Sequence, residues 1–313
     1  MIQKLINFLN NCDLKKLNQG LDELDKKIEE IFLKSNASID DETLSVIQNK
    51  SSYFFCWFCF LRANFLRGKD ITSNRAFRQF LTNIKWRNYY FDNFPQGSEK
   101  LLPQFSNPKF QQAKVIEEVL QQLRRKYKSG YEFVKEIKEM ANSYEIEDIH
   151  RLYLELISKF MSFKQIGSKI ANAIIGETLW ELTLLRRHKK KTFQNLLKEK
   201  WIRKLALASC FNVMIDTHVR NFFKEKLNIK DVQHSILIFL ANCIKPELIE
   251  FLFDRNFKWI PEKKLILKKY QEYVGANVIE KLIWVAYFVI KNSRRSDNIN
   301  NLQFFQIKGN PFL

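Results

Sequence analysis

The chain has 313 residues, of which 46% are hydrophobic, so it is long enough to bury a sizeable core. Its eight glycines and six prolines supply too few turn residues for a fold rich in hairpins or in alternating strands and helices. The 52 basic residues exceed the 34 acidic residues by 18, which favours a polyanionic partner, with nucleic acid ahead of anionic lipid. We therefore predict an all-α protein that binds nucleic acid.

The N-terminal residues predict an amphipathic helix. Leucine or isoleucine recurs at alternating spacings of three and four from Leu14 to Ile31, the pattern of a helix that packs on another surface. The seam is short and contains Gly20, so we expect the body of the same protein to supply that surface. We predict a helical arm over residues 1–35 and a linker, "SNASIDDET", over 35–43.

The cysteines predict free thiols. Five is an odd number and the chain shows no cleavable signal pattern, so we expect an intracellular protein, cytoplasmic or nucleoid, without a disulfide framework. Cys56 and Cys59 form one Cys-x-x-Cys pair, without the second pair or the spaced histidines of a zinc site. They lie in the longest apolar run, Tyr53 to Leu61, which is too short to span a bilayer and predicts a core helix.

The next stretch is dense in aromatic side chains. Residues 74–95 interleave arginine and lysine with phenylalanine, tryptophan and tyrosine, which is typical of a nucleic-acid surface. Phe77, Phe80 and Ile84 share one helical stripe, however, so we expect most of these rings in the core. A loop is predicted at 95–108, then helices at 109–127, 130–142, 146–162, 217–227, 231–242, 246–254, 262–272 and 275–291, and a loosely held tail at 293–313.

Two segments carry candidate chemistry. In "FKQIGSKIANAIIGE", residues 163–177, Gly167 separates one helix from a second that begins with small or polar residues. Such a turn presents free backbone amides, which favour a phosphate, and Lys169 lies in the first turn of the second helix. In "VMIDTHVRNFF", residues 213–223, Asp216 is placed to cap the helix 217–227.

Together these segments resemble the helix-hairpin-helix (HhH-GPD) superfamily of DNA glycosylases, the group of endonuclease III and the 8-oxoguanine glycosylases. That family carries an apolar-x-Gly-apolar-Gly-x-Lys-x-Ala hairpin, matched here by residues 163–171, and an apolar-Asp-Thr-His-Val segment, matched by 215–219. The resemblance implies a two-lobed helical body over 41–292, with the hairpin at 163–177 and the aspartate segment at 213–227. It implies that Lys169 is the nucleophile and Asp216 the essential aspartate. His218, beside the aspartate, is expected to be structural.

Gln165, Gly167 and Ser168 are implied to bind DNA phosphate, but the chain departs from the family pattern here. Gln165 stands where the family has its first hairpin glycine, which strains the backbone if that position needs a positive φ. The separation of Lys169 from Asp216 is also longer than in the family. The excess is a basic insertion at 186–204, with nine lysines or arginines and one glutamate.

This insertion is expected either to contact DNA or to be a solvated helix on a loop. The candidate DNA contacts in it are Arg186, Arg187, Lys189, Lys190 and Lys191.

The resemblance implies a bifunctional DNA glycosylase and AP lyase of base excision repair. It would act as a monomer on double-stranded DNA with a damaged base, without a membrane, a metal or an organic cofactor. The four-cysteine cluster of endonuclease III is missing, which excludes its iron–sulfur cluster and favours 8-oxoguanine as the base removed. Two alternatives stay open: a non-catalytic helical protein that binds DNA or docks a partner, and a monofunctional glycosylase in which Asp216 activates water. A membrane-surface protein ranks last.

Overall fold

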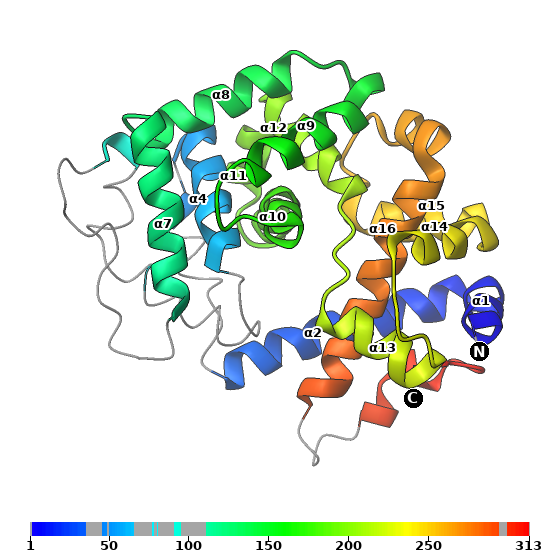
Figure 1. Ribbon diagram of the computed structural model, residues 1–313. Coiled ribbons are helices and arrows are strands. Elements are labelled where there is room, and N and C mark those ends of the chain that lie inside the picture. The colour runs from blue at the N-terminus through cyan, green and yellow to red at the C-terminus, as the bar shows by residue number, and fades with distance from the viewer. Residues whose placement is uncertain are drawn as a thin grey trace. The chain divides into compact units, whose positions relative to one another are not determined.

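The computed structural model describes residues 2–35, 46–48, 50–65, 77, 80, 91–94, 111–293 and 299–312 (Figure 1). All regular structure within these ranges is helical, which confirms the all-α prediction. The chain divides into two compact units. Unit 1 combines Met1–Ser35 with Val213–Leu313, and unit 2 is Asn36–Asn212.

Unit 1 is built around one long helix, α16 (Lys263–Asn292), which packs against α2, α13, α14 and α15 (Figure 1). Two helices were predicted over this stretch. They form one element with a kink at Tyr270, whose φ of −134° and ψ of 29° are not helical. The other elements of unit 1 are α1 (Ile2–Asn11), α2 (Leu14–Lys34), α13 (Thr217–Leu227), α14 (His234–Cys243), α15 (Pro246–Phe257), η3 (Ile299–Asn301) and α17 (Gln303–Gln306).

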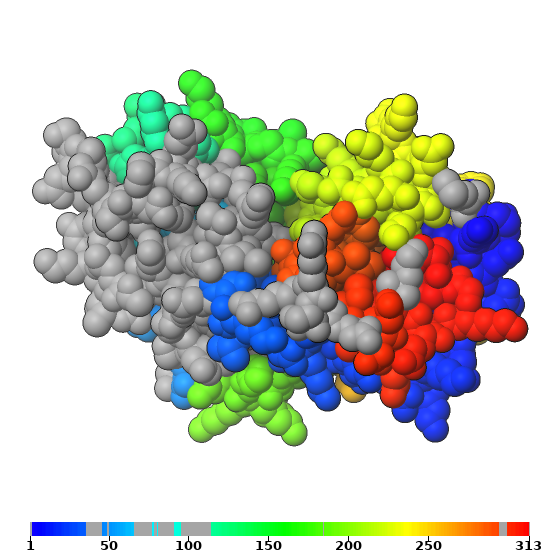
Figure 2. Space-filling model, turned by 90° about the horizontal axis from the view of Figure 1, so that it is seen from below, coloured from blue at the N-terminus to red at the C-terminus, as the bar shows by residue number. Residues whose placement is uncertain are grey.

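The two ends of the chain belong to this unit, which differs from the predicted arm (1–35) and loosely held tail (293–313). The apolar seam of α2 faces inward, and α2 packs on both α16 and α17. Arg255 of α15 pairs with Asp22 and Asp25 of α2, each at 2.8 Å. Phe304 and Phe312 of the tail are fully buried. Figure 2 shows the C-terminal residues in red beside the N-terminal residues in blue. The tail was misjudged because its buried rings follow no helical period.

Unit 2 is built around α10 (Ser168–His188), which packs against α4, α9, α11 and α12 (Figure 1). Helix α4 (Ser52–Phe65) holds the apolar run and is buried as predicted, with Trp57 at its centre. The other elements are α7 (Gln111–Lys126), α8 (Gly130–Asn142), η1 (Ile146–Asp148), α9 (Ile149–Met161), α11 (Lys190–Leu197), α12 (Lys200–Ala208) and η2 (Ser209–Phe211).

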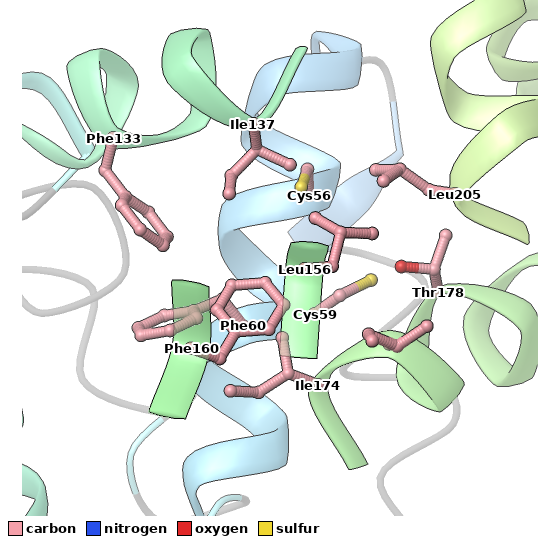
Figure 3. Close-up of a pocket in the computed structure, with 11 residues that line it drawn as sticks. Cys56, Cys59, Phe60, Phe133, Ile137, Leu156, Phe160, Ile174, Thr178 and Leu205 are labelled. Carbon is pink, nitrogen blue, oxygen red and sulfur yellow. The ribbon is translucent and has the colours of Figure 1, made fainter. Parts of the chain in front are cut away.

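The interior of unit 2 contains both members of the Cys-x-x-Cys pair. Cys56 and Cys59 line a cavity of about 20 Å³ together with Phe60, Phe160 and other apolar side chains (Figure 3). This volume holds about one water molecule, so the cavity is too small for a substrate. Burial raises the pKa of the Cys56 thiol to about 12, which keeps it protonated at neutral pH. All five cysteines are free thiols, and the described residues contain no cluster of three or more potential metal ligands.

Several predicted features fall partly or wholly outside the described residues. The linker at 35–43 and the loop at 95–108 are among them, apart from Ser35. Of the aromatic stretch at 74–95, only Phe77, Phe80 and 91–94 are described, and Phe77 and Phe80 are buried as expected for core residues.

One helix in the described ranges, α16, is long and apolar enough to cross a membrane by length and composition alone. Its most apolar window has a mean hydropathy of 1.4, and 72% of that window is buried inside the protein. A helix that is apolar on most sides is what the centre of a globular unit requires.

Candidate active site

The predicted hairpin lies in unit 2 between α9 and α10. Helix α9 ends at Met161, and the backbone amide of Ile166 donates to the carbonyl of Phe163 at 3.0 Å, closing a four-residue turn. Gln165, the third residue of that turn, has a φ of +76°. A type II turn requires a positive φ at its third position, which is why glycine is favoured there. The position occupied by glycine in the family therefore has the glycine-like conformation here, in a residue with a side chain.

This left-handed conformation costs about 1–2 kcal/mol for a residue other than glycine. Side chains of α7 hold the turn in place. The Gln165 amide donates to Glu118 at 2.7 Å. Gln122 accepts from the backbone amide of Lys164 at 2.8 Å and donates to the carbonyl of the same residue at 3.0 Å.

The start of α10 has no side-chain cap. Gly167 is the N-cap residue and lacks a side chain, so the first amides of the helix have no side-chain acceptor. Uncapped amides at the positive end of a helix dipole favour an anion. Gln165, Gly167, Ser168 and Lys169 are all exposed around this helix start. In the described part of the chain, Lys169 forms no ion pair.

The first turn of α10 is fixed to the helix before it. The Asn172 amide donates to the carbonyl of Ser168 at 2.9 Å, and its oxygen accepts from the Tyr153 hydroxyl of α9 at 2.8 Å. Asn172 is only 4% exposed, and burial raises the pKa of Tyr153 to about 12. The hydroxyl therefore stays a hydrogen-bond donor across the physiological pH range, and the segment that carries Lys169 is held rigidly.

Asp216 lies in unit 1 and is the N-cap of α13, as predicted. One carboxylate oxygen accepts from the backbone amide of Val219 at 2.9 Å. The other accepts from the indole of Trp284, on α16, at 3.0 Å. The side chain is half-buried, so Asp216 is held by contacts that an ordinary exposed cap does not make.

A second acid lies close to this aspartate. Glu280, one turn before Trp284 on α16, is 5% exposed and accepts a hydrogen bond from the backbone amide of Met214. Burial, and then the negative charge of Asp216, raise the pKa of Glu280 well above its usual range. His218 packs its ring against Trp284 and Phe288, in agreement with the structural role expected for it.

The predicted basic insertion covers the end of α10, the whole of α11 and the start of α12, and these parts differ in their exposure to solvent. Arg187, Lys190 and Lys191 are exposed at the end of α10 and on α11, while Arg186 and Lys189 are half-buried. Burial, and then the charge of Arg187, lower the pKa of Arg186.

Helix α12, by contrast, is part of the core, where Trp201 is 1% exposed. Lys204 is buried and donates to the carbonyl of Tyr144. The segment 186–204 is therefore not a single solvated helix on a loop, because Trp201, Ile202 and Lys204 near its end are buried.

Several residues of the site carry no signal in the sequence. Glu118 and Gln122 lie on α7 and support the hairpin, while Glu280 and Trp284 lie on α16 and surround Asp216. They are separated from the residues they support by at least 42 positions. No local motif links two segments so distant in sequence.

Comparison with known proteins adds no relative. No family model, no curated protein and no solved structure matches the chain. The resemblance to the helix-hairpin-helix glycosylases therefore rests on the two sequence segments alone.

Proposed function

We propose that this protein is a bifunctional DNA glycosylase and AP lyase that removes an oxidised base, with 8-oxoguanine favoured, through a Schiff base on Lys169. The observation that carries the proposal is the conformation of Gln165. Its φ of +76° is a conformation that favours glycine, the residue that the family has at this position, and it lies immediately before an uncapped helix and an exposed lysine. A sequence match without this turn would have far less weight, because a Gly-x-Lys tripeptide is common.

The chemistry assigned to Lys169 is nucleophilic substitution at the sugar. A target base must leave the stack before its sugar can be attacked. The neutral amine forms a bond to C1′ as the glycosidic bond breaks, and the base departs with a proton. The second amine proton passes to the ring oxygen as the C1′–O4′ bond breaks, which gives the imine. Removal of a C2′ proton then breaks the C3′–O bond and expels the 3′ phosphate by β-elimination. None of these steps uses a metal or an organic cofactor.

The proposal gives Asp216 an electrostatic role. A carboxylate stabilises the positive charge that develops on the sugar as the base departs. Support comes from the two hydrogen bonds that hold both oxygens of Asp216, because a fixed charge needs no reorganisation during the reaction.

Borohydride trapping tests the proposal. Wild type and Lys169→Gln are incubated at low salt with duplexes that contain 8-oxoguanine, thymine glycol or an abasic site, and the imine is reduced to a stable adduct. We expect an adduct with wild type, strongest on 8-oxoguanine among the base lesions, and none with Lys169→Gln. Lys164 is an exposed lysine five residues before Lys169, so Lys164→Gln is the matched control and should trap like wild type.

The outcomes separate the proposal from its two alternatives. Base release without an adduct, abolished by Asp216→Asn, would indicate a monofunctional glycosylase. Tight, salt-sensitive DNA binding with neither base release nor an adduct would indicate a protein that uses the hairpin only to hold phosphate. Either result would refute the lysine mechanism.

A further inference from the structure

Helix α10 has a single open face. From Ile170 to Leu185, every residue whose burial is described is buried except Gly176 and Thr183, which are half-buried, and Trp180, which is exposed. At about 100° per residue, these three positions lie within about 40° of the line through Lys169 along the helix. Arg187, exposed near the end of α10, lies on the same line. We call Lys169, Gly176, Trp180, Thr183 and Arg187 the α10 strip.

An exposed aromatic ring lies in the middle of this strip. The Trp180 side chain is 42% exposed, whereas the rest of the helix around it is core. Trp180 is about 16 Å from Lys169 along the axis, and Arg187 about 27 Å, at 1.5 Å per residue. A flat indole with an open face is a stacking platform for any nucleobase.

The exposed charges on α10 and α11 themselves have one sign. Between Ser168 and Lys198 the only acidic residues are Glu177 and Glu181, and both are buried. Arg62 of α4 pairs with both of them in the interior, at 2.7 Å in the case of Glu177. The exposed charged side chains of this segment are therefore all lysine or arginine, with Arg187, Lys190 and Lys191 grouped at its far end.

We propose that the α10 strip binds an unpaired stretch of the DNA strand, with Trp180 stacking on a base and Arg187 contacting a phosphate. The inference rests on the proposed function in taking DNA as the polyanion. An unpaired strand is favoured over duplex because base pairs within a helix offer no open face for an indole. A lipid surface is disfavoured, since one exposed aromatic ring on a helix is far less than the apolar face of a membrane-bound helix.

The test measures binding of the full-length protein to fluorescent oligothymidylate and to a fluorescent duplex of equal length, over a salt series. We expect Trp180→Leu to weaken oligothymidylate binding about tenfold, since stacking contributes about 1–3 kcal/mol per base. Duplex binding should change less than about twofold, because a paired base offers no stacking partner. Trp180→Phe, which retains a smaller ring, should recover most of the affinity. Arg187→Gln should reduce the salt slope for oligothymidylate by about 0.7, the value for one phosphate contact.

Two variants away from the strip serve as matched controls. Tyr131 on α8 is also 42% exposed, so Tyr131→Leu removes an equally exposed ring. Arg151 on α9 has a side chain 74% exposed, so Arg151→Gln removes an exposed cation. Both are expected to bind oligothymidylate within about twofold of wild type, because neither lies on the strip. A thermal melt of each variant checks that it folds.

The inference is wrong if Trp180→Leu binds oligothymidylate no more weakly than Tyr131→Leu does, or if it loses as much affinity for duplex as for the single strand. Binding to anionic vesicles that depends on Trp180, without any effect on DNA, would also overturn it. Adduct formation at Lys169 is measured separately. If Trp180→Leu does not weaken oligothymidylate binding, the lyase proposal is unaffected. If binding depends on Trp180 but no adduct forms, only the lyase proposal is refuted.

Discussion

Glu280 is a buried acid whose ionisation differs between the folded and unfolded chain. It is buried in unit 1 close to Asp216 and accepts from the amide of Met214, while the neighbouring Lys281 partly offsets the effect of Asp216. Its folded pKa lies well above the ordinary value of a glutamate. Folding therefore favours the neutral acid over the carboxylate at this position, and ionisation of Glu280 opposes folding.

The sign of the resulting pH dependence follows by linkage. Above the unfolded pKa, the unfolded chain has lost this proton and the folded chain still holds it, so stability falls as pH rises until the folded pKa is reached. The maximum slope is about 1.4 kcal/mol per pH unit. Because Glu280→Gln has no proton to lose, we expect this variant to gain stability relative to wild type as the pH rises above the pKa of an unfolded glutamate, about 4.3. Denaturant midpoints at several pH values measure the difference.

Glu250→Gln, at an exposed position on α15, is the control for that measurement and should give a curve parallel to that of wild type. Parallel curves for wild type and Glu280→Gln would show instead that Glu280 ionises in the folded state as it does in the unfolded state.

For single residues, the sequence predicted the roles that depend on neighbouring positions in the chain. Asp216 was expected to cap a helix because it precedes one, and it does. Gln165 was expected to be strained only if its position needs a positive φ, and the structure gives it that φ. The contact of Trp284 with Asp216 was not predictable, because 68 positions separate the two residues and only the packing of α16 brings them together.

The packing of whole elements depends on close approach at one glycine. Gly20 lies on the buried face of α2, where α17 crosses it. A Cβ atom at position 20 would lie 2.6 Å from both the Cα and the backbone nitrogen of Phe304. Backbone atoms cannot rotate away as a side chain can, so α17 would have to shift as a unit.

We therefore expect Gly20→Ala to destabilise the protein by about 1–3 kcal/mol, the usual cost of overpacking, although alanine favours helix by about 1 kcal/mol. Gly176→Ala provides the contrast. Its nearest obstruction is the amide nitrogen of Asn212, the far end of a side chain that can move. Thermal or denaturant unfolding compares the two variants, and equal stability losses would contradict the distinction between backbone and side-chain obstruction.

Periodic elements were the predictable part of the fold. Helices α8 and α13 begin and end where the sequence pattern placed them, since each has a regular apolar face and a capping residue before it. The tail was not predictable, because Phe304, Phe305 and Phe312 are buried against partners distant in sequence rather than along a helical stripe. The core position of α12 was also missed, since its lysines and arginines conceal the apolar side of the helix.

At the scale of the whole molecule, unit 2 comes from one continuous stretch of chain, whereas unit 1 needs both ends. The contribution of the N-terminal end is large. Leu17, Leu21, Leu24, Ile28 and Ile31 of α2 are all buried, and burial of each contributes about 1.5–3 kcal/mol. Their sum is comparable with the entire stability of a typical domain, about 5–15 kcal/mol. Residues 213–313 should therefore be unable to fold stably without residues 1–35.

This expectation is testable by fragment complementation. The fragment 213–313 alone should be partly helical without a cooperative thermal transition, because the faces of α16 and α17 that α2 covers are then open. Adding the peptide 1–35 should restore a cooperative transition by circular dichroism. The midpoint should rise with peptide concentration, since a ligand that binds only the folded state stabilises it. A peptide with Leu24→Asp, which places a charge in the buried seam, should not complement. If the fragment melts cooperatively alone and is unaffected by the peptide, α2 covers a core that is already complete, and its burial follows folding instead of enabling it.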